Sequence, residues 1–224
     1  MLAAVIFDMD GVILDSHPIH RRAWKRFLEA VGVSVTPEEL EFVTQGGKRE
    51  DILRHYLGSL TAEQVRAYGH WKEALFREEA LAIDPMPGLA EFINELEVAG
   101  LPIAIASCGS RQRILYVLDR LRWTSRFRVV IAGDDVVQGK PDPAIFRKAA
   151  DELGVRHREV VVFEDAVAGI QGAVAAGMKA VGVASNGTAH GLLAAGAARV
   201  VPDFVNVSVT DVQLLFQRET VAMG

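Results

Sequence analysis

Short runs of consecutive apolar residues recur along the chain, and each run ends at polar or small residues. Continuous apolar character, in place of alternation, is typical of strands buried on both faces, as in a parallel sheet covered by helices on each side. Helical patterns alternate with the later runs from Pro87 onward, which predicts an α/β fold with a doubly wound parallel sheet. The predicted strands are Ala4–Phe7, Pro102–Ala106, Val129–Ala132, Val160–Phe163, Ala180–Val183 and Arg199–Val201.

The stretch between Ser16 and Asp84 contains no strand-like run. Capping boxes begin at Thr36 and Thr61 and mark helix starts, because the hydroxyl and the acid or amide three residues later satisfy free backbone N–H groups. Apolar residues also recur at helical spacing before them, at Ile19, Ala23, Phe27 and Val31. We therefore predict a small all-helical cap domain at residues 16–83, inserted into an α/β core formed by residues 1–15 and 84–224.

The overall charge of the chain is mildly acidic. It has 24 Lys and Arg against 29 Asp and Glu, a formal net charge of −5, which argues against nucleic acid or an anionic membrane as the main partner because both require a basic footprint. The single cysteine, Cys108, excludes an internal disulfide and fits a reducing compartment. No apolar run reaches the ~18 residues of a spanning helix, and the first residues do not resemble a signal peptide. We expect a cytoplasmic protein that is a monomer or a weak homodimer.

Two carboxylates, Asp8 and Asp10, follow the first predicted strand. Residues two apart in an extended segment point the same way, so both side chains can project from the carboxyl edge of the sheet, where open α/β folds bind ligands. Two close carboxylates repel unless a cation joins them or one holds a proton. Taken alone, the pair fits a solvated turn at a strand end as well as it fits a functional site.

Polar residues with the same placement follow three further strands. Ser107 offers a hydroxyl to a phosphate oxygen, Lys140 is held between Gly139 and Pro141, and Glu164 and Asp165 offer hard oxygen ligands to Mg²⁺. Each has a structural alternative: a turn serine, a surface lysine, or acids that favour a helix N-terminus. Their occurrence at four strand ends of one chain favours a common site.

These residues occur in the order Asp8-x-Asp10-Gly11, Ser107, Lys140-Pro141 and Glu164-Asp165. In this combination the sequence resembles the haloacid dehalogenase superfamily of phosphotransferases over essentially the whole chain. The resemblance implies a Rossmann-like core. The helical insert is similar to the small cap of the β-phosphoglucomutase-like and phosphoglycolate phosphatase-like subgroup. The second aspartate disfavours dehalogenation, because the dehalogenases of the superfamily lack it.

The resemblance also implies a catalytic role for each motif residue. Asp8 attacks phosphorus and becomes an aspartyl-phosphate, Asp10 serves as general acid and base, and Ser107 and Lys140 hold the transferring phosphoryl group. The implied cofactor is Mg²⁺. Its implied ligands are Asp8, the backbone carbonyl of Asp10, and Asp165, with Glu164 as a further or outer ligand.

The same resemblance implies substrate-binding residues in and near the cap. His20 matches a histidine of the sugar-phosphate mutases, and Gly46-Gly47-Lys48-Arg49 resembles their substrate-reading loop, in which the arginine holds a distal phosphate. Cys108 and Gly109 are expected beside the phosphate next to Ser107. The alternatives are an exposed histidine and a solvated charge run. The sequence departs from the mutase pattern at two places: Gln45 stands where those enzymes carry a lysine, and Cys108-Gly109-Ser110-Arg111 lacks the lysine and asparagine that the pattern has after the serine.

We therefore predict a Mg²⁺-dependent phosphatase that hydrolyses a small phosphorylated metabolite, a sugar or polyol phosphate, through an aspartyl-phosphate on Asp8. One alternative is a β-phosphoglucomutase that interconverts β-glucose 1-phosphate and glucose 6-phosphate. The other is a non-enzymatic receiver-like module that is phosphorylated to signal.

Overall fold

Six parallel strands form one sheet at the centre of the molecule, in the order β3-β2-β1-β4-β5-β6. The computed structural model describes residues 1–184 and 188–217. Each predicted strand is present, with bounds that move by one residue at most. Pro102, which lacks an N–H, precedes β2 but accepts a hydrogen bond from Val5 through its carbonyl. The strands are β1 (Ala4–Phe7), β2 (Ile103–Ala106), β3 (Val129–Ile131), β4 (Val160–Glu164), β5 (Lys179–Val183) and β6 (Arg199–Val201).

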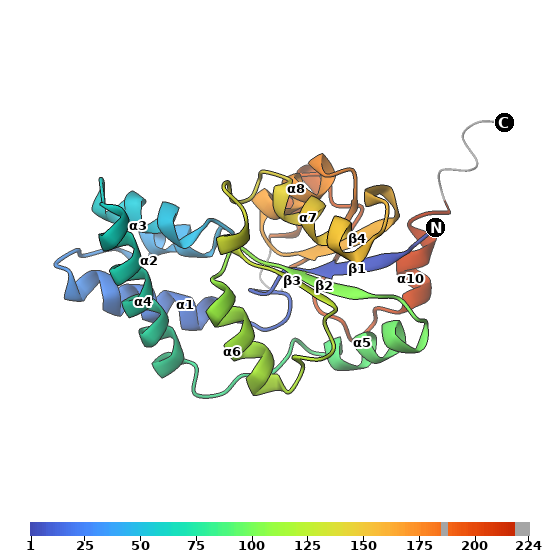
Figure 1. Ribbon diagram of the computed structural model, residues 1–224, viewed down its shortest axis with the longest axis horizontal. Helices are drawn as coiled ribbons and strands as arrows, with labels where there is room; N and C mark the ends of the chain where they lie inside the picture. The colour runs from blue at the N-terminus through green and yellow to red at the C-terminus, as the bar shows by residue number, and fades with distance from the viewer. Residues whose placement is uncertain (185–187, 218–224) are drawn as a thin grey trace.

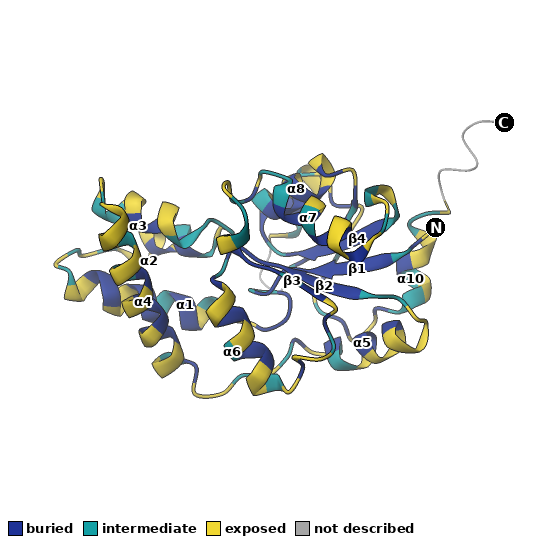
Figure 2. Cartoon of the chain, in the orientation of Figure 1, coloured by how far each residue is buried: buried dark blue, intermediate teal, exposed yellow. Residues whose placement is uncertain are grey.

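Helices cover both faces of this sheet (Figure 1). Because side chains alternate along a strand, Phe7 faces one core and Ile6 the other. The Phe7 core packs against α5 (Leu89–Val98), α6 (Arg111–Leu121) and α10 (Val209–Leu214), and the Ile6 core packs against α7 (Ala144–Leu153), α8 (Val167–Ala175) and α9 (Ala189–Ala194). Short 3₁₀ turns lie at Gly133–Asp135 and His157–Glu159. Dark blue strands between helices with exposed outer faces show this layering in Figure 2.

The register of the sheet places the predicted motif residues side by side. Phe7 pairs with Ile105 on β2 and with Phe163 on β4. Asp8 and Glu164 therefore follow paired residues on neighbouring strands, and the backbone N–H of Asp8 donates to the Phe163 carbonyl at 2.9 Å. The carboxyl edge of β1 and its two neighbours is thus the floor on which the site is built.

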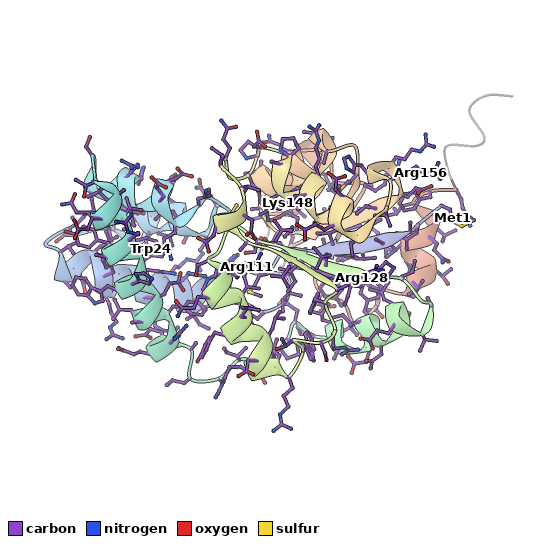
Figure 3. The ribbon with its side chains drawn as sticks, viewed as in Figure 1. Met1, Trp24, Arg111, Arg128, Lys148 and Arg156 are labelled. Carbon is purple, nitrogen blue, oxygen red and sulfur yellow. The ribbon has the colours of Figure 1, made fainter. Side chains whose placement is uncertain are left out.

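The segment between β1 and α5 is helical, as predicted, and we call residues 17–79 the helical insert. It contains α1 (His17–Ala30), α2 (Pro37–Leu40), the 3₁₀ turn η1 (Glu41–Thr44), α3 (Arg49–Leu57) and α4 (Ala62–Glu79). Both predicted capping boxes form, at Thr36 and Thr61. Helices α1 and α4 pack on each other: the buried ring of Phe27 contacts the rings of Tyr68 and Trp71, and Lys72 lies over the buried ring of Trp24, labelled in Figure 3.

The helical insert lies beyond one end of the sheet, beside the carboxyl edge of its strands (Figure 1). The division into domains at residues 15/16 and 83/84 stays a prediction. Within residues 1–184 and 188–217, no helix combines the length and the apolar character needed to cross a membrane.

Candidate active site

A pocket lies between the carboxyl edge of the sheet and the helical insert. The core contributes Asp8, Asp10, Ser107, Cys108, Gly109 and Arg113 to its wall. The insert contributes His20, Gly46, Gly47, Arg49, Lys72 and Glu73. Of the predicted site residues, the structure brings all but Lys48 into this pocket or directly beneath it.

Beneath the pocket, Lys140 joins two carboxylates. Its Nζ donates to Asp8 Oδ1 at 2.5 Å and to Glu164 Oε2 at 2.7 Å, and all three side chains are buried. Burial, together with the charges of Glu164 and Asp10, raises the pKa of Asp8 to about 7 against the lowering effect of Lys140. Burial alone would lower the pKa of Lys140, but Asp8 and Glu164 raise it far above its ordinary value. Lys140 is therefore a fixed cation against the predicted nucleophile.

Three carboxylates at this edge have the spacing of a metal site. Oxygens of Asp8, Glu164 and Asp165 lie within 4.8 Å of one another. Glycines make room for them: a Cβ at Gly11 would overlap the Asp165 carboxylate, and a Cβ at Gly169 would overlap that of Glu164. This set of hard oxygen donors fits Mg²⁺, which takes one or two carboxylates and keeps several waters.

The two acidic residues after β4 differ in how their oxygens are occupied. Glu164 Oε1 accepts from the backbone N–H groups of Asp165 and Ala166, and its Oε2 accepts from Lys140. Asp165 Oδ2 lies 2.9 Å from His17 Nε2 and lines the pocket. Asp165 is therefore the better placed of the two to bind a metal directly, and Glu164 the better placed to hold Lys140.

Asp10 is held by three side chains. Ser16 Oγ donates to it at 2.6 Å, His20 Nε2 lies at 3.1 Å, and Arg113 donates two hydrogen bonds of 2.7 Å each. Burial alone would raise the pKa of Asp10, but Arg113 and His20 hold it well below its ordinary value. Asp10 is thus an anion in this arrangement and can accept a proton.

Arg113 is a site residue that the sequence analysis missed. It lies on α6, one turn after the serine motif, and its side chain is 4% exposed. No local spacing in the sequence pointed to it; in the structure, a Cβ at Gly109 would overlap the Arg113 guanidinium. Gly109, predicted as a substrate contact, thus also makes room for Arg113.

Two charged residues on α4, Lys72 and Glu73, were also missed. Lys72 Nζ lies 2.9 Å from Nδ1 of His20. Burial and the charge of Lys72 lower the pKa of His20 to about 4, so the ring is neutral near pH 7. Burial lowers the pKa of Lys72 itself to about 8. The signal for Lys72 was its helical spacing from Phe76 on the buried face of α4, where a lysine is rarely found without a partner.

The predicted loop Gly46–Arg49 divides in two. Gly46, Gly47 and Arg49 line the pocket. The side chain of Lys48 instead reaches the loop after β3 in the α/β core, where its Nζ donates to the carbonyls of Val136 at 2.8 Å and Val137 at 3.2 Å. Lys48 therefore joins the helical insert to the loop after β3.

The pocket is narrow but partly open to solvent in this arrangement. The space that the centre of a water molecule can reach inside it is about 50 Å³.

Known proteins share both sequence and fold with this chain. The phosphorylated carbohydrates phosphatase of Thermotoga maritima is 31% identical over 89% of this chain and 94% of its own length. The β-phosphoglucomutase of Bacillus subtilis is 32% identical over 81% and 83%.

Among solved structures, the β-phosphoglucomutase of Clostridium difficile superposes with a TM-score of 0.88, at 26% identity, over 99% of this chain and all of that one. CbbY from Rhodobacter sphaeroides in complex with xylulose-(1,5)bisphosphate superposes with a TM-score of 0.81, at 28% identity, over 92% and 96%.

Residues 2–177 match the haloacid dehalogenase-like hydrolase family. This match and the enzymes among the relatives show that the alternative of a non-enzymatic receiver module is wrong. The chain belongs to the haloacid dehalogenase-like hydrolases, and it is an enzyme with phosphatase or phosphotransferase activity.

Proposed function

We propose that the chain is a Mg²⁺-dependent phosphatase that hydrolyses a small sugar or polyol phosphate through an aspartyl-phosphate on Asp8. The observation that carries this proposal is the pairing of Asp8 with Lys140 at the floor of a pocket that Asp10 also lines. A nucleophile held by a fixed cation, with an acid–base group in the same pocket, is what phosphoryl transfer to a carboxylate requires.

The proposed reaction has two halves. In the first, an oxygen of Asp8 forms a bond to phosphorus, the ester P–O bond breaks, and a proton from Asp10 goes to the leaving oxygen. In the second, water attacks the phosphorus, Asp10 accepts the proton of the water, and the Asp8–phosphorus bond breaks to release inorganic phosphate. Lys140 and the Ser107 hydroxyl hold the phosphoryl oxygens throughout. When bound at the carboxylate cluster, Mg²⁺ supplies positive charge that offsets repulsion between Asp8 and the phosphate.

The pairing of Arg113 with Asp10 suits the second half of the proposed reaction better than the first. A carboxylate held by a guanidinium accepts a proton readily and donates one poorly. The first half requires Asp10 to hold a proton, so we infer that Asp10 leaves Arg113 before the ester bond breaks.

Hydrolysis is favoured over mutase activity by the positions of three polar residues. A mutase must bind a bisphosphate in two orientations, which requires cations for the distal phosphate. Lys48 donates to backbone carbonyls instead. Arg111, labelled in Figure 3, donates to the Val130 carbonyl and pairs with Asp135 outside the pocket. Ser110 caps α6.

The relatives support both candidate activities. The carbohydrate phosphatase supports hydrolysis of a sugar or polyol phosphate, and the similarity to β-phosphoglucomutases in sequence and fold keeps the mutase as the second candidate. A cytoplasmic location, the absence of a nucleic-acid partner and a monomeric or weakly dimeric state stay predictions.

One assay separates hydrolysis from isomerisation. Purified protein with Mg²⁺ is given β-glucose 1-phosphate and a trace of glucose 1,6-bisphosphate, and both glucose 6-phosphate and inorganic phosphate are measured. A panel of sugar and polyol monophosphates is screened in parallel for phosphate release. We expect phosphate release from members of the panel. Formation of glucose 6-phosphate much faster than phosphate would establish the mutase instead.

A further inference from the structure

A buried carboxylate of the helical insert, that of Glu73, enters the pocket without a hydrogen bond. Glu73 lies on α4, is 6% exposed and lines the same pocket as Asp8. Its Oε1 is 3.8 Å from Arg49 Nη1, and its Oε2 is 3.8 Å from Arg113 Nε. Both separations exceed hydrogen-bond length. Within the described part of the chain, no group donates a hydrogen bond to Glu73, and Arg113 Nε is itself buried without a partner.

Glu73 is an anion at neutral pH. Burial alone would raise its pKa, but the charges of Lys72, Arg113 and Arg49 hold it below its ordinary value. A buried carboxylate with no donor leaves acceptor sites that a substrate can fill.

The cations around Glu73 are largely committed to other groups. Arg113 donates two hydrogen bonds to Asp10, and Lys72 lies at hydrogen-bond distance from Nδ1 of His20. Arg49 lines the pocket with Glu73 as its ion-pair partner. A second phosphate bound by Arg49 would therefore approach the Glu73 carboxylate, and an anion near a largely buried carboxylate is repelled more strongly than in bulk water.

We propose that Glu73 is a specificity-determining residue: its carboxylate accepts hydrogen bonds from hydroxyls of an uncharged polyhydroxy leaving group and disfavours substrates that carry a second phosphate. This inference rests on the proposed phosphatase function and restricts its substrates to monophosphates. The competing hypothesis is a purely structural role, in which the Glu73 carboxylate only balances the charges of Arg49 and Arg113.

The test measures how tightly a monophosphate and its matching bisphosphate compete with a common substrate. Hydrolysis of p-nitrophenyl phosphate is followed for the wild type and for Glu73→Gln, with glucose 6-phosphate and glucose 1,6-bisphosphate as competitors. Glutamine keeps the shape and one acceptor but removes the charge. The ratio of the two inhibition constants within one preparation does not depend on how much of the protein is active, so a partial loss of folding does not obscure it.

The matched control is Glu79→Gln on the same helix. Glu79 pairs with Arg22 and Arg26 on the surface, away from the pocket. We expect Glu73→Gln to shift the ratio about tenfold in favour of the bisphosphate, as removal of one nearby charge predicts, and Glu79→Gln to leave it unchanged.

An unchanged ratio in an active Glu73→Gln enzyme, or an equal shift in Glu79→Gln, overturns the role of Glu73 alone. A wild type that releases phosphate neither from p-nitrophenyl phosphate nor from any sugar or polyol phosphate overturns the proposed function, and this inference with it.

Discussion

The guanidinium of Arg113 and the carboxylate of Asp10 face each other with two parallel hydrogen bonds of 2.7 Å, one from each terminal nitrogen. The two residues come from α6 and from the turn after β1, 103 positions apart in the chain. Bidentate pairing fixes orientation as well as charge. Arg113 therefore fixes the orientation of the Asp10 carboxylate, the proposed acid–base group, and favours its ionised form.

Replacement of Arg113 by glutamine is expected to move the acidic limb of the pH–rate profile. Glutamine removes the positive charge but keeps a donor for Asp10, so the pKa of Asp10 rises, and a higher pH is needed to keep it as a base. We expect the acidic limb for p-nitrophenyl phosphate to move up by about 1–3 pH units. The control is Arg111→Lys, because Arg111 lies two positions away and pairs outside the pocket. An acidic limb that stays in place in Arg113→Gln would show that Arg113 does not set the protonation of Asp10.

The floor of this site was predictable from the sequence, but three residues of its walls, Arg113, Lys72 and Glu73, were not. Asp8, Ser107 and Glu164 each follow an apolar run, and a parallel sheet necessarily brings such strand ends to one edge. Arg113 and Glu73 meet only because the helical insert docks on the core, and the contact joins α6 to α4. No local spacing encodes a contact of that kind.

Lys48 shows the converse error: the sequence predicted it as a pocket residue, and the structure places it outside the pocket. The resemblance placed it with Arg49 in a substrate-reading loop. Adjacent residues at a helix start point in different directions, so docking sends Arg49 into the pocket and Lys48 to the carbonyls after β3. Which of the two reaches the substrate depends on the angle of the insert, a tertiary property.

Asp8→Asn is expected to abolish turnover and leave the fold intact. An amide is a far weaker nucleophile than a carboxylate, so phosphate release should fall by about 10³-fold or more. Lys140 keeps Glu164 as a partner at 2.7 Å, so no unpaired cation is left buried. We expect a melting temperature within about 4 °C of the wild type, which corresponds to about 1 kcal/mol for a chain of this size. Retention of wild-type turnover by folded Asp8→Asn would exclude the aspartyl-phosphate.

Mg²⁺ is expected to stabilise the protein more at high pH than at low pH. The pKa of Asp8 is raised to about 7 in the folded chain, so between about pH 4 and pH 7 the folded state keeps a proton that the unfolded state has lost, and this contribution to stability disappears as the pH rises through 7. Mg²⁺ needs the deprotonated carboxylate and competes with that proton. At a concentration about 100 times its Kd, the ion contributes about 2.7 kcal/mol.

The measurement is thermal unfolding with Mg²⁺ and with a chelator, at about pH 5.5 and about pH 8, on either side of the Asp8 pKa. We expect an increase in melting temperature of roughly 5–10 °C at the higher pH and a smaller one at the lower. Asp8→Asn is the control, because it removes this titrating ligand and with it the part of the pH dependence that Asp8 contributes; Glu164 and Asp165, whose pKa values are also raised, remain. Equal increases at both pH values would show that Asp8 does not bind the metal.

Lys48→Met is expected to weaken closure of the helical insert without touching the chemistry. Methionine keeps the aliphatic stem that packs against Gly139 but removes the hydrogen bonds to Val136 and Val137. The loss of two hydrogen bonds, about 1 kcal/mol each, makes the closed state less favourable by up to about 2 kcal/mol, so we expect KM to rise by up to about thirtyfold for every substrate. The comparison that decides is between p-nitrophenyl phosphate and glucose 1,6-bisphosphate, with Lys25→Met, on the exposed face of α1, as the control. A rise for both substrates assigns Lys48 to closure. A rise in KM confined to the bisphosphate would support the substrate-binding role that the sequence predicts for Lys48, because only a ligand with a distal phosphate would then interact with its charge.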